Sequence, residues 1–457
     1  MDDLLRDVAA RTGRYLEQLP ERPVSAAPEA IAALERLGGA LPETGSDAAE
    51  ILSLLDEVGT PATVASAGPR YFGFVTGGAL PASLAANWLA GAWDQNSFST
   101  IGSPLGAAID AVALEWLREI FGLPEGCGGA LVTGATMANF TGLSAARHAV
   151  LTAAGWDLDE EGLAGAPPVS IVVGGEAHAT LFRALRLLGF GKRNLVRVPV
   201  DSQGRMLADA LPALSGPTIV CLQAGNVNTG AFDPAAPIIE QAHAAGAWVH
   251  VDGAFGLWAA ATPQRAHLMD GYAGADSWAV DGHKWLNVPY DCGIALVRRP
   301  ADLSAAMAIQ AAYLPMEEQR QPIHFTPESS RRMRGLEVWA ALKSLGRAGV
   351  AEMVERNCRQ AARMAEGLRA AGFEILNEVV LNQVLVSFGP AAVTQRVITA
   401  VQAEGTCWCG GTVWQDKTAM RISVSNWATT DADIERSLDA IVRVAKAEID
   451  AAAQTAS

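Results

Sequence analysis

A lysine that follows an apolar run is the residue of this sequence best suited to covalent chemistry. Lys284 stands in the run DGHKW (residues 281–285), directly after the apolar residues 277–280. A lysine held among tryptophans and apolar groups is more easily neutral, and a neutral amine can form an imine with an aldehyde. The competing interpretation is a lysine in a surface loop, which leaves the neighbouring histidine and tryptophans unexplained.

Two more candidate groups follow predicted strands. The apolar run 247–251 ends at Asp252, and Ala254 comes shortly after it. A carboxylate there can hold a proton on a ring nitrogen, and a small residue leaves flat space for a ring. An aspartate that caps a turn is the alternative. His178 follows the run 170–173 and could stack on a planar cofactor or move a proton, although a lone histidine is more often structural.

The segment VTGATMAN (132–139) favours anion binding. It leads from a predicted strand through a glycine turn into a helix, whose free N–H groups suit a phosphate. An ordinary strand–helix turn and a dinucleotide loop that includes Gly142 are the alternatives. A short-chain dehydrogenase also needs a tyrosine with a lysine four residues later, and none of the five tyrosines has one. Hydride transfer to a nicotinamide therefore lacks its base.

Short apolar runs alternate with helical stretches through the middle of the chain. This alternation predicts an α/β fold with a mainly parallel sheet flanked by helices, whose ligands bind at the carboxyl ends of the strands. The pair Ser103-Pro104 predicts the start of a helix. The expected strands are 129–133, 170–173, 218–223, 247–251, 277–280 and 293–298, and the expected helices include 137–153 and 179–188.

Three regions are expected along the chain. Residues 1–80 form a helical segment that prolines interrupt, and residues 81–335 form the large α/β domain. Residues 336–457 form a small α+β domain with a long helix over 337–371, short strands over 379–388 and 420–424, and a closing helix from Asp431.

Composition narrows the possible partners. The 457 residues are 50% hydrophobic and 18% charged, which excludes a disordered chain. With 34 Lys and Arg against 49 Asp and Glu, the formal charge is −15, which argues against nucleic acid or an anionic membrane as the main partner. The acidic start has the wrong charge order for a secretion signal, and no apolar run is long enough to span a membrane.

The six cysteines are scattered, at 127, 221, 292, 358, 407 and 409. They form no CxxC pair, and the CxC at 407–409 has no partner pair at metal-site spacing. We therefore expect reduced thiols, no metal and a cytoplasmic protein.

As a set, these segments resemble the fold-type I pyridoxal-phosphate enzymes, and most closely the group II decarboxylases that include aromatic-L-amino-acid decarboxylases. The resemblance runs from about residue 66 to the C-terminus. It is carried by HKW (283–285) with DC (291–292), EAH (176–178), AGNVNTGAFD (224–233), HVDGA (250–254) and the pair SP (103–104). The sequence departs from the family where Asn226-Val227 replaces Thr-Thr, where Asp281-Gly282 replaces Asn-Pro, and where Met137 replaces a small polar residue.

The resemblance implies a catalytic role for four residues. Lys284 would attach the cofactor covalently, and Asp252 would pair with its ring nitrogen. His178 would stack on the ring and orient the substrate carboxylate. Tyr313, in a loop downstream of the lysine, would donate a proton to the substrate carbon after carbon dioxide leaves.

The resemblance also implies the binding residues. Thr76 and Phe98 would line the substrate pocket, with Phe98 supplied by the neighbouring subunit of a homodimer that shares its active sites. The amides of Ala135 and Thr136, together with His283, would hold the phosphate. The whole cofactor-binding set is Gly134, Ala135, Thr136, Met137, His178, Asn226, Asp252, Ala254, Asp281, His283 and Lys284.

The implied activity is decarboxylation of an L-amino acid of the tryptophan, tyrosine or phenylalanine class, with pyridoxal 5'-phosphate as cofactor. The alternatives are a decarboxylation-dependent aldehyde synthase, another lyase with this cofactor, and a decarboxylase of an acidic amino acid, whose side chain Arg421 could face. Aldehyde-forming relatives usually replace the loop tyrosine or the stacking histidine, and this chain keeps Tyr313 and His178. A non-catalytic relative would be expected to have lost Lys284 or Asp252.

Overall fold

The computed structural model describes residues 2–308 and 320–456. Two compact units make up this part of the chain. The central unit combines Ala79–Ala361 with Asn377–Gln383. The terminal unit combines the residues up to Gly78 with Ala362–Leu376 and the residues from Val384 onward. Among the described residues, no helix has the length and apolar character needed to cross a membrane.

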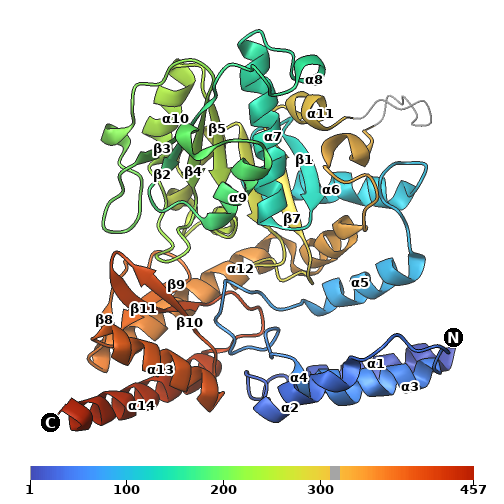
Figure 1. The fold of residues 1–457 in the computed structure, drawn as a ribbon, viewed down its shortest axis with the longest axis vertical. Helices are drawn as coiled ribbons and strands as arrows, with labels where there is room; N and C mark the ends of the chain where they lie inside the picture. The colour runs from blue at the N-terminus through green and yellow to red at the C-terminus, as the bar shows by residue number, and fades with distance from the viewer. Residues whose placement is uncertain (1, 309–319, 457) are drawn as a thin grey trace. The chain divides into compact units, whose positions relative to one another are not determined.

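A seven-stranded sheet lies at the centre of the central unit (Figure 1). Its strands lie in the order β1-β7-β6-β5-β4-β2-β3. Only β7 is antiparallel to its neighbours, which confirms the predicted mainly parallel α/β fold. The strands are β1 (Gly128–Val132), β2 (Ser170–Gly174), β3 (Leu195–Val198), β4 (Thr218–Gln223), β5 (Trp248–Asp252), β6 (Ser277–Asp281) and β7 (Gly293–Val297).

The six strands expected from apolar runs are all present, and β3 is an additional one. β3 is one of the two edge strands, and its residues Val196 and Arg197 are exposed. A strand with one paired edge and a charged residue lacks the continuous apolar run that marks strands buried on both faces. The interior strands β5, β6 and β7 are fully buried, as their sequences predict.

Helices cover the sheet of the central unit (Figure 1). α7 packs along β5, β6 and β7, and the core beneath it includes Leu143, Ile171, Ile219 and Trp248. Ser103 caps α6 as predicted, because its hydroxyl accepts the N–H of Gly106. The helices are α5 (Pro81–Trp93), α6 (Pro104–Ile120), α7 (Ala135–Ala153), α8 (Leu158–Glu161), α9 (Ala179–Leu187), α10 (Ala235–Ala244), α11 (Pro300–Met307) and α12 (Arg334–Ala370).

The long helix α12 is interrupted at Gly346, whose φ is 62°. This left-handed conformation favours glycine, since a side chain there would be strained. The sequence predicted one uninterrupted helix in this region, because a single glycine within a helical pattern does not reveal the kink.

The terminal unit contains helices from both ends of the chain and a four-stranded sheet of order β10-β11-β9-β8. The strands are β8 (Glu374–Ile375), β9 (Gln383–Ser387), β10 (Gly410–Trp414) and β11 (Lys417–Ser423). The helices are α1 (Asp2–Gln18), α2 (Pro28–Ala33), α3 (Ala48–Leu54), α4 (Thr60–Ala62), α13 (Ala391–Glu404) and α14 (Asp431–Ala456).

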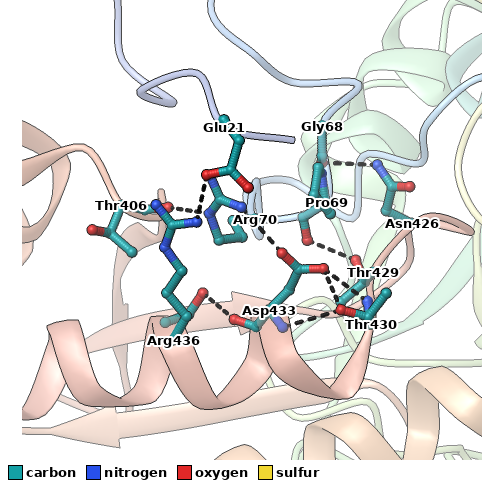
Figure 2. Close-up of polar contacts among 11 residues, drawn as sticks. Glu21, Gly68, Pro69, Arg70, Thr406, Asn426, Thr429, Thr430, Asp433 and Arg436 are labelled. Carbon is teal, nitrogen blue, oxygen red and sulfur yellow. Dashed lines mark hydrogen bonds and ion pairs between the residues drawn. The ribbon is translucent and has the colours of Figure 1, made fainter. Parts of the chain in front are cut away.

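A buried arginine joins early and late segments of the terminal unit, as Figure 2 shows. Arg70 is 3% exposed, donates to the carbonyl of Thr406 at 2.8 Å and pairs with Asp433 at 3.1 Å. The two residues before it are held through their carbonyls, which accept from Asn426 (to Gly68, 2.9 Å) and from Thr429 (to Pro69, 2.7 Å). Loss of Asp433 would leave the buried charge of Arg70 uncompensated, so this ion pair helps to fix the segment on the C-terminal helix.

Candidate active site

The lysine singled out in the sequence lies in a partly buried position beyond the end of β6. The side chain of Lys284 is 19% exposed, and its Nζ lies 3.2 Å from Asp281 Oδ2. Nζ also lies 5.9 Å from the centre of the Phe255 ring. Trp285 is fully buried and donates to Asn357 Oδ1 at 3.0 Å, which anchors the backbone beside the lysine. These contacts exclude the interpretation as a surface loop.

Asp281 links this lysine to the start of α7. Its Oδ1 accepts the N–H of Ala135 at 2.6 Å, and the indole of Trp258 donates to its carbonyl at 3.3 Å. Ala135 is one of the two residues whose amides were predicted to hold a phosphate. In this structure the carboxylate therefore occupies the anion site that the helix start provides.

His283 completes this corner of the site. Its Nδ1 accepts the N–H of Cys292 at 3.1 Å, and its Nε2 lies 3.4 Å from Asp281 Oδ1. Burial lowers the pKa of His283, against the opposing effect of Asp281. The ring is therefore neutral near pH 7, with its hydrogen on Nε2, directed at the same anion site. The ring of Tyr290 stacks on it with centroids 4.3 Å apart.

Two glycines let these elements approach closely. A Cβ on Gly134 would lie 3.1 Å from Cε1 of His283, and one on Gly293 would lie 2.4 Å from the backbone carbon of Gly134. The second distance is too short for any side chain. The turn before α7 and the start of β7 therefore form a cradle that larger residues would fill.

Asp252 ends β5 and is 5% exposed. Its carboxylate accepts Asn139 Nδ2 at 3.2 Å and the N–H of Ala254 at 3.3 Å. A cavity at the carboxyl ends of β2, β4 and β5 is lined by Asp252, His178 and Gln223 among others. His178 caps α9, with its Nδ1 2.7 Å from Thr180 Oγ1. The structure thus brings the predicted acid and the predicted stacking histidine to one cavity.

Comparison with known proteins decides the family. The conserved domain of pyridoxal-dependent decarboxylases matches residues 32–389. The chain belongs to the pyridoxal-dependent decarboxylase family. The family's aromatic-L-amino-acid decarboxylase of Bacillus atrophaeus is 25% identical over 443 residues, which cover 92% of this chain and 90% of that protein. An acidic amino acid decarboxylase of mouse is 27% identical and covers 74% of this chain and 63% of its own length. The crystal structure of the Oryza sativa TDC with PLP and tryptamine shares the fold, with a TM-score of 0.89, 22% identity and 97% coverage of each chain.

The cofactor of the family, pyridoxal phosphate, fits the residues present. The cofactor has an aldehyde, a basic ring nitrogen and a phosphate, and the site offers an amine, a buried carboxylate and a helix start beside a neutral histidine. Among the described residues no group of three or more His, Cys, Asp or Glu could hold a metal ion. The amine, the carboxylate and the helix start together suit an organic cofactor with an anionic group.

Other residues of the predicted cofactor-binding set have structural contacts of their own. Asn226 is buried, and its Oδ1 accepts the N–H groups of Asn228 (2.8 Å) and Thr229 (3.2 Å). Its side chain thus stabilises its own turn. Met137 packs on the small apolar cluster between α7 and the sheet, and Thr136, next to it, is half-buried.

The predicted substrate-binding residues lie in different units. Thr76 is buried in the terminal unit, where its carbonyl accepts the Ser425 hydroxyl at 3.0 Å. Phe98 belongs to the central unit and is half-buried, and its carbonyl accepts the N–H of Ile323 at 2.8 Å. Tyr313 lies outside the described residues.

Sequence reasoning missed two groups that line or support the cavity. Asn139 was noted only as the end of the anion-binding segment, yet its amide contacts Asp252. Asp233 is fully buried, accepts the N–H groups of Met206 and Gln223 at 2.7 Å each, and has its pKa raised to about 6 by burial. A polar residue one helical turn beyond a glycine turn was the available signal for Asn139, whereas Asp233 was marked only as the last residue of the motif AGNVNTGAFD and was given no role.

Proposed function

We propose that this enzyme decarboxylates an aromatic L-amino acid to the corresponding amine, and that Lys284, Asp252 and His178 carry the chemistry. The observation that carries the proposal is the meeting of Asp252 and His178 at one cavity, with Lys284 beyond the end of β6, the strand next to β5. The chain also has the amine and the carboxylate that this chemistry needs, in Lys284 and Asp252.

The proposed roles follow from the position of each group. Lys284 Nζ would attach the cofactor at its aldehyde carbon, whose oxygen would leave as water, and the carboxylate of Asp252 would hold a proton on the ring nitrogen. The start of α7 at Ala135 and the Nε2–H of His283 direct N–H groups at the phosphate. When bound, pyridoxal phosphate supplies an electron-poor ring that accepts the electron pair left by departing carbon dioxide.

Two further groups act on the substrate itself in this proposal. His178 would stack on the ring and orient the substrate carboxylate, so that the bond to be broken would be held in place. Tyr313 delivers a proton to the substrate carbon, which gives an amine rather than an oxidised product.

The preference for an aromatic substrate rests on Phe98 and Thr76 and on the similarity to aromatic-L-amino-acid decarboxylases. We propose that Phe98 reaches the site of the neighbouring subunit in a homodimer. Exposed large apolar side chains that flank Phe98 in the sequence support this assembly, because such side chains commonly contribute to an interface. They are Trp88, Leu89, Trp93, Ile101 and Leu105.

We also propose a cytoplasmic location. All six cysteines are buried and free, which is usual for a protein kept in a reducing compartment.

The test is product analysis on the holoenzyme. Each of the twenty amino acids is supplied separately, and carbon dioxide, amine, aldehyde and hydrogen peroxide are measured. We expect carbon dioxide and amine in equal amounts from tryptophan, tyrosine or phenylalanine, without peroxide. Turnover of aspartate or glutamate alone would overturn the aromatic assignment. Peroxide in step with carbon dioxide would instead identify an aldehyde synthase, the activity named for one relative of this chain.

A further inference from the structure

Behind Asp252, buried side chains form a continuous chain of hydrogen bonds that ends at Trp248. Asn139 Nδ2 donates to Asp252 at 3.2 Å, and Asn139 Oδ1 lies 2.8 Å from His250 Nε2. His250 Nδ1 lies 2.8 Å from Ser277 Oγ, to which the Trp248 indole donates at 2.9 Å. Asn139, His250 and Ser277 are completely buried, so water does not compete for these bonds.

The Asn139 amide fixes the direction of every bond in this chain. Its Nδ2 donates to the Asp252 carboxylate, so its Oδ1 faces His250 Nε2, and because an amide oxygen can only accept, Nε2 must donate. Burial lowers the pKa of His250 to about 3, so the ring is neutral and carries a single hydrogen. That hydrogen lies on Nε2, so His250 Nδ1 accepts from the Ser277 hydroxyl, whose oxygen in turn accepts from the Trp248 indole.

We propose that Asn139, His250 and Ser277 are positioning residues that keep the Asp252 carboxylate ionised and thereby keep a proton on the ring nitrogen of the cofactor. This inference rests on the proposed function of Asp252. A carboxylate and a ring nitrogen share one proton, and an N–H donated to the carboxylate favours its charged form. Without that donor the proton moves toward the carboxylate, and the ring withdraws electrons less strongly.

Gly142 gives independent support for this arrangement. A Cβ at this position on α7 would lie 3.0 Å from Cε1 and 3.1 Å from Nδ1 of His250. The glycine that the sequence offered as part of a dinucleotide loop therefore leaves space for the imidazole beneath the helix. An alanine would keep every donor and acceptor of the chain but would displace the ring.

The test is the protonation state of the ring nitrogen in the holoenzyme, measured by ¹⁵N NMR with pyridoxal phosphate labelled at that nitrogen. We expect a protonated nitrogen in the wild type and a shift toward the unprotonated value in Asn139→Leu, with smaller shifts in the same direction in Ser277→Ala and Gly142→Ala. The hydrogen bond to a charged group implies that kcat falls about ten- to hundredfold in Asn139→Leu while KM changes little.

Thr141→Val is the matched control. Thr141 is buried on the same helix, and its hydroxyl has no hydrogen-bond partner in the described part of the chain. We expect the wild-type ¹⁵N shift in this variant. An unchanged shift in Asn139→Leu would refute the inference while leaving decarboxylation by the wild type intact. If Asn139→Leu does not fold, an unchanged shift in Ser277→Ala would refute it equally, and an unprotonated nitrogen in the wild type would overturn both this inference and the role proposed for Asp252.

Discussion

Lys284 Nζ lies 3.2 Å from the carboxylate of Asp281, three residues earlier in the chain. The same carboxylate accepts the N–H of Ala135 at the start of α7. One acid therefore contacts both the lysine that we propose attaches the cofactor and the helix start that we propose holds its phosphate. The group II decarboxylases that this sequence resembles commonly have an uncharged asparagine at this position, so the carboxylate distinguishes this chain.

Replacing Asp281 by asparagine is expected to tighten cofactor binding. The amide oxygen of the new side chain would still accept the Ala135 N–H, whereas the negative charge beside the phosphate would be removed. Asp281 is buried, and loss of one like-charge contact is worth about 1–4 kcal/mol as screening falls from that of water to that of a protein, so we expect Kd for pyridoxal phosphate to fall about tenfold or more. Fluorescence titration of the apoenzyme measures this. Weaker binding by Asp281→Asn would show instead that the carboxylate helps to hold the cofactor.

Lys284→Ala is expected to abolish both turnover and the visible absorbance of the covalently attached cofactor. Without the amine no imine can form with the protein, although the phosphate and ring contacts remain. Absorbance spectroscopy and carbon dioxide release are measured on the same sample. Lys343→Ala, which removes a lysine outside the site, is the control and should retain both signals. A Lys284→Ala protein that kept both would refute the assignment.

The sequence predicted the strands that position this site better than the side-chain contacts within it. Apolar runs such as 277–280 and 247–251 are typical of buried parallel strands. The sequence therefore predicted that Lys284 and Asp252 lie at or just beyond strand ends. The contact of Asn139 with Asp252 joins residues 113 positions apart, and it depends on how α7 lies across the sheet. Local periodicity carries no information on such a crossing. The edge strand β3 was missed because exposure to solvent makes its residues as polar as those of a loop.

The buried His250 predicts a specific pH dependence of stability. Its pKa is lowered from 6.5 to about 3 by burial. Below pH 6.5 the unfolded chain therefore binds a proton at His250 that the folded chain does not bind. The contribution of the neutral His250 to the free energy of unfolding is complete above pH 6.5 and is lost as the pH falls toward 3. We expect the stability advantage of the wild type over His250→Gln to shrink by about 1.4 kcal/mol per pH unit in that window.

Urea unfolding of the two proteins at several pH values measures this difference. The comparison with the variant is needed because Asp233, whose pKa burial raises to about 6, acts in the opposite sense over part of the same range. Its effect is common to both proteins and cancels. Parallel stability curves between pH 4 and 6.5 would mean that His250 is already charged in the folded protein.

A buried ion pair away from the cavity is expected to make a large contribution to the free energy of unfolding. Arg331 donates to Asp110 at 2.5 Å, and both side chains are at most 2% exposed. Asp110→Asn would leave the guanidinium buried without its counter-charge, at a cost of about 3–5 kcal/mol. Chemical denaturation measures the loss. The exposed pair of Arg347 with Glu119 provides the control, since Glu119→Gln should change stability by less than about 1 kcal/mol.

The last prediction concerns the subunit that supplies Phe98. If Phe98 reaches the neighbouring site, Phe98→Ala and Lys284→Ala damage different sites of a mixed dimer. One site then combines the intact lysine of one chain with the intact phenylalanine of the other. With random mixing, about half of the dimers contain one chain of each variant, and each of these has one complete site and one damaged site. Activity should therefore return to about a quarter of the wild-type level.

The experiment unfolds, mixes and refolds the two inactive variants together and compares decarboxylation with that of each variant refolded alone. Trp93→Glu, a change at one of the exposed apolar side chains that flank Phe98 in the sequence, should weaken the dimer in analytical ultracentrifugation, and Leu187→Glu, a change at an exposed leucine of α9, should not. If the mixture stays inactive while the dimer forms normally, Phe98 acts within its own chain. If both substitutions leave the dimer unchanged, the subunits associate through a different surface.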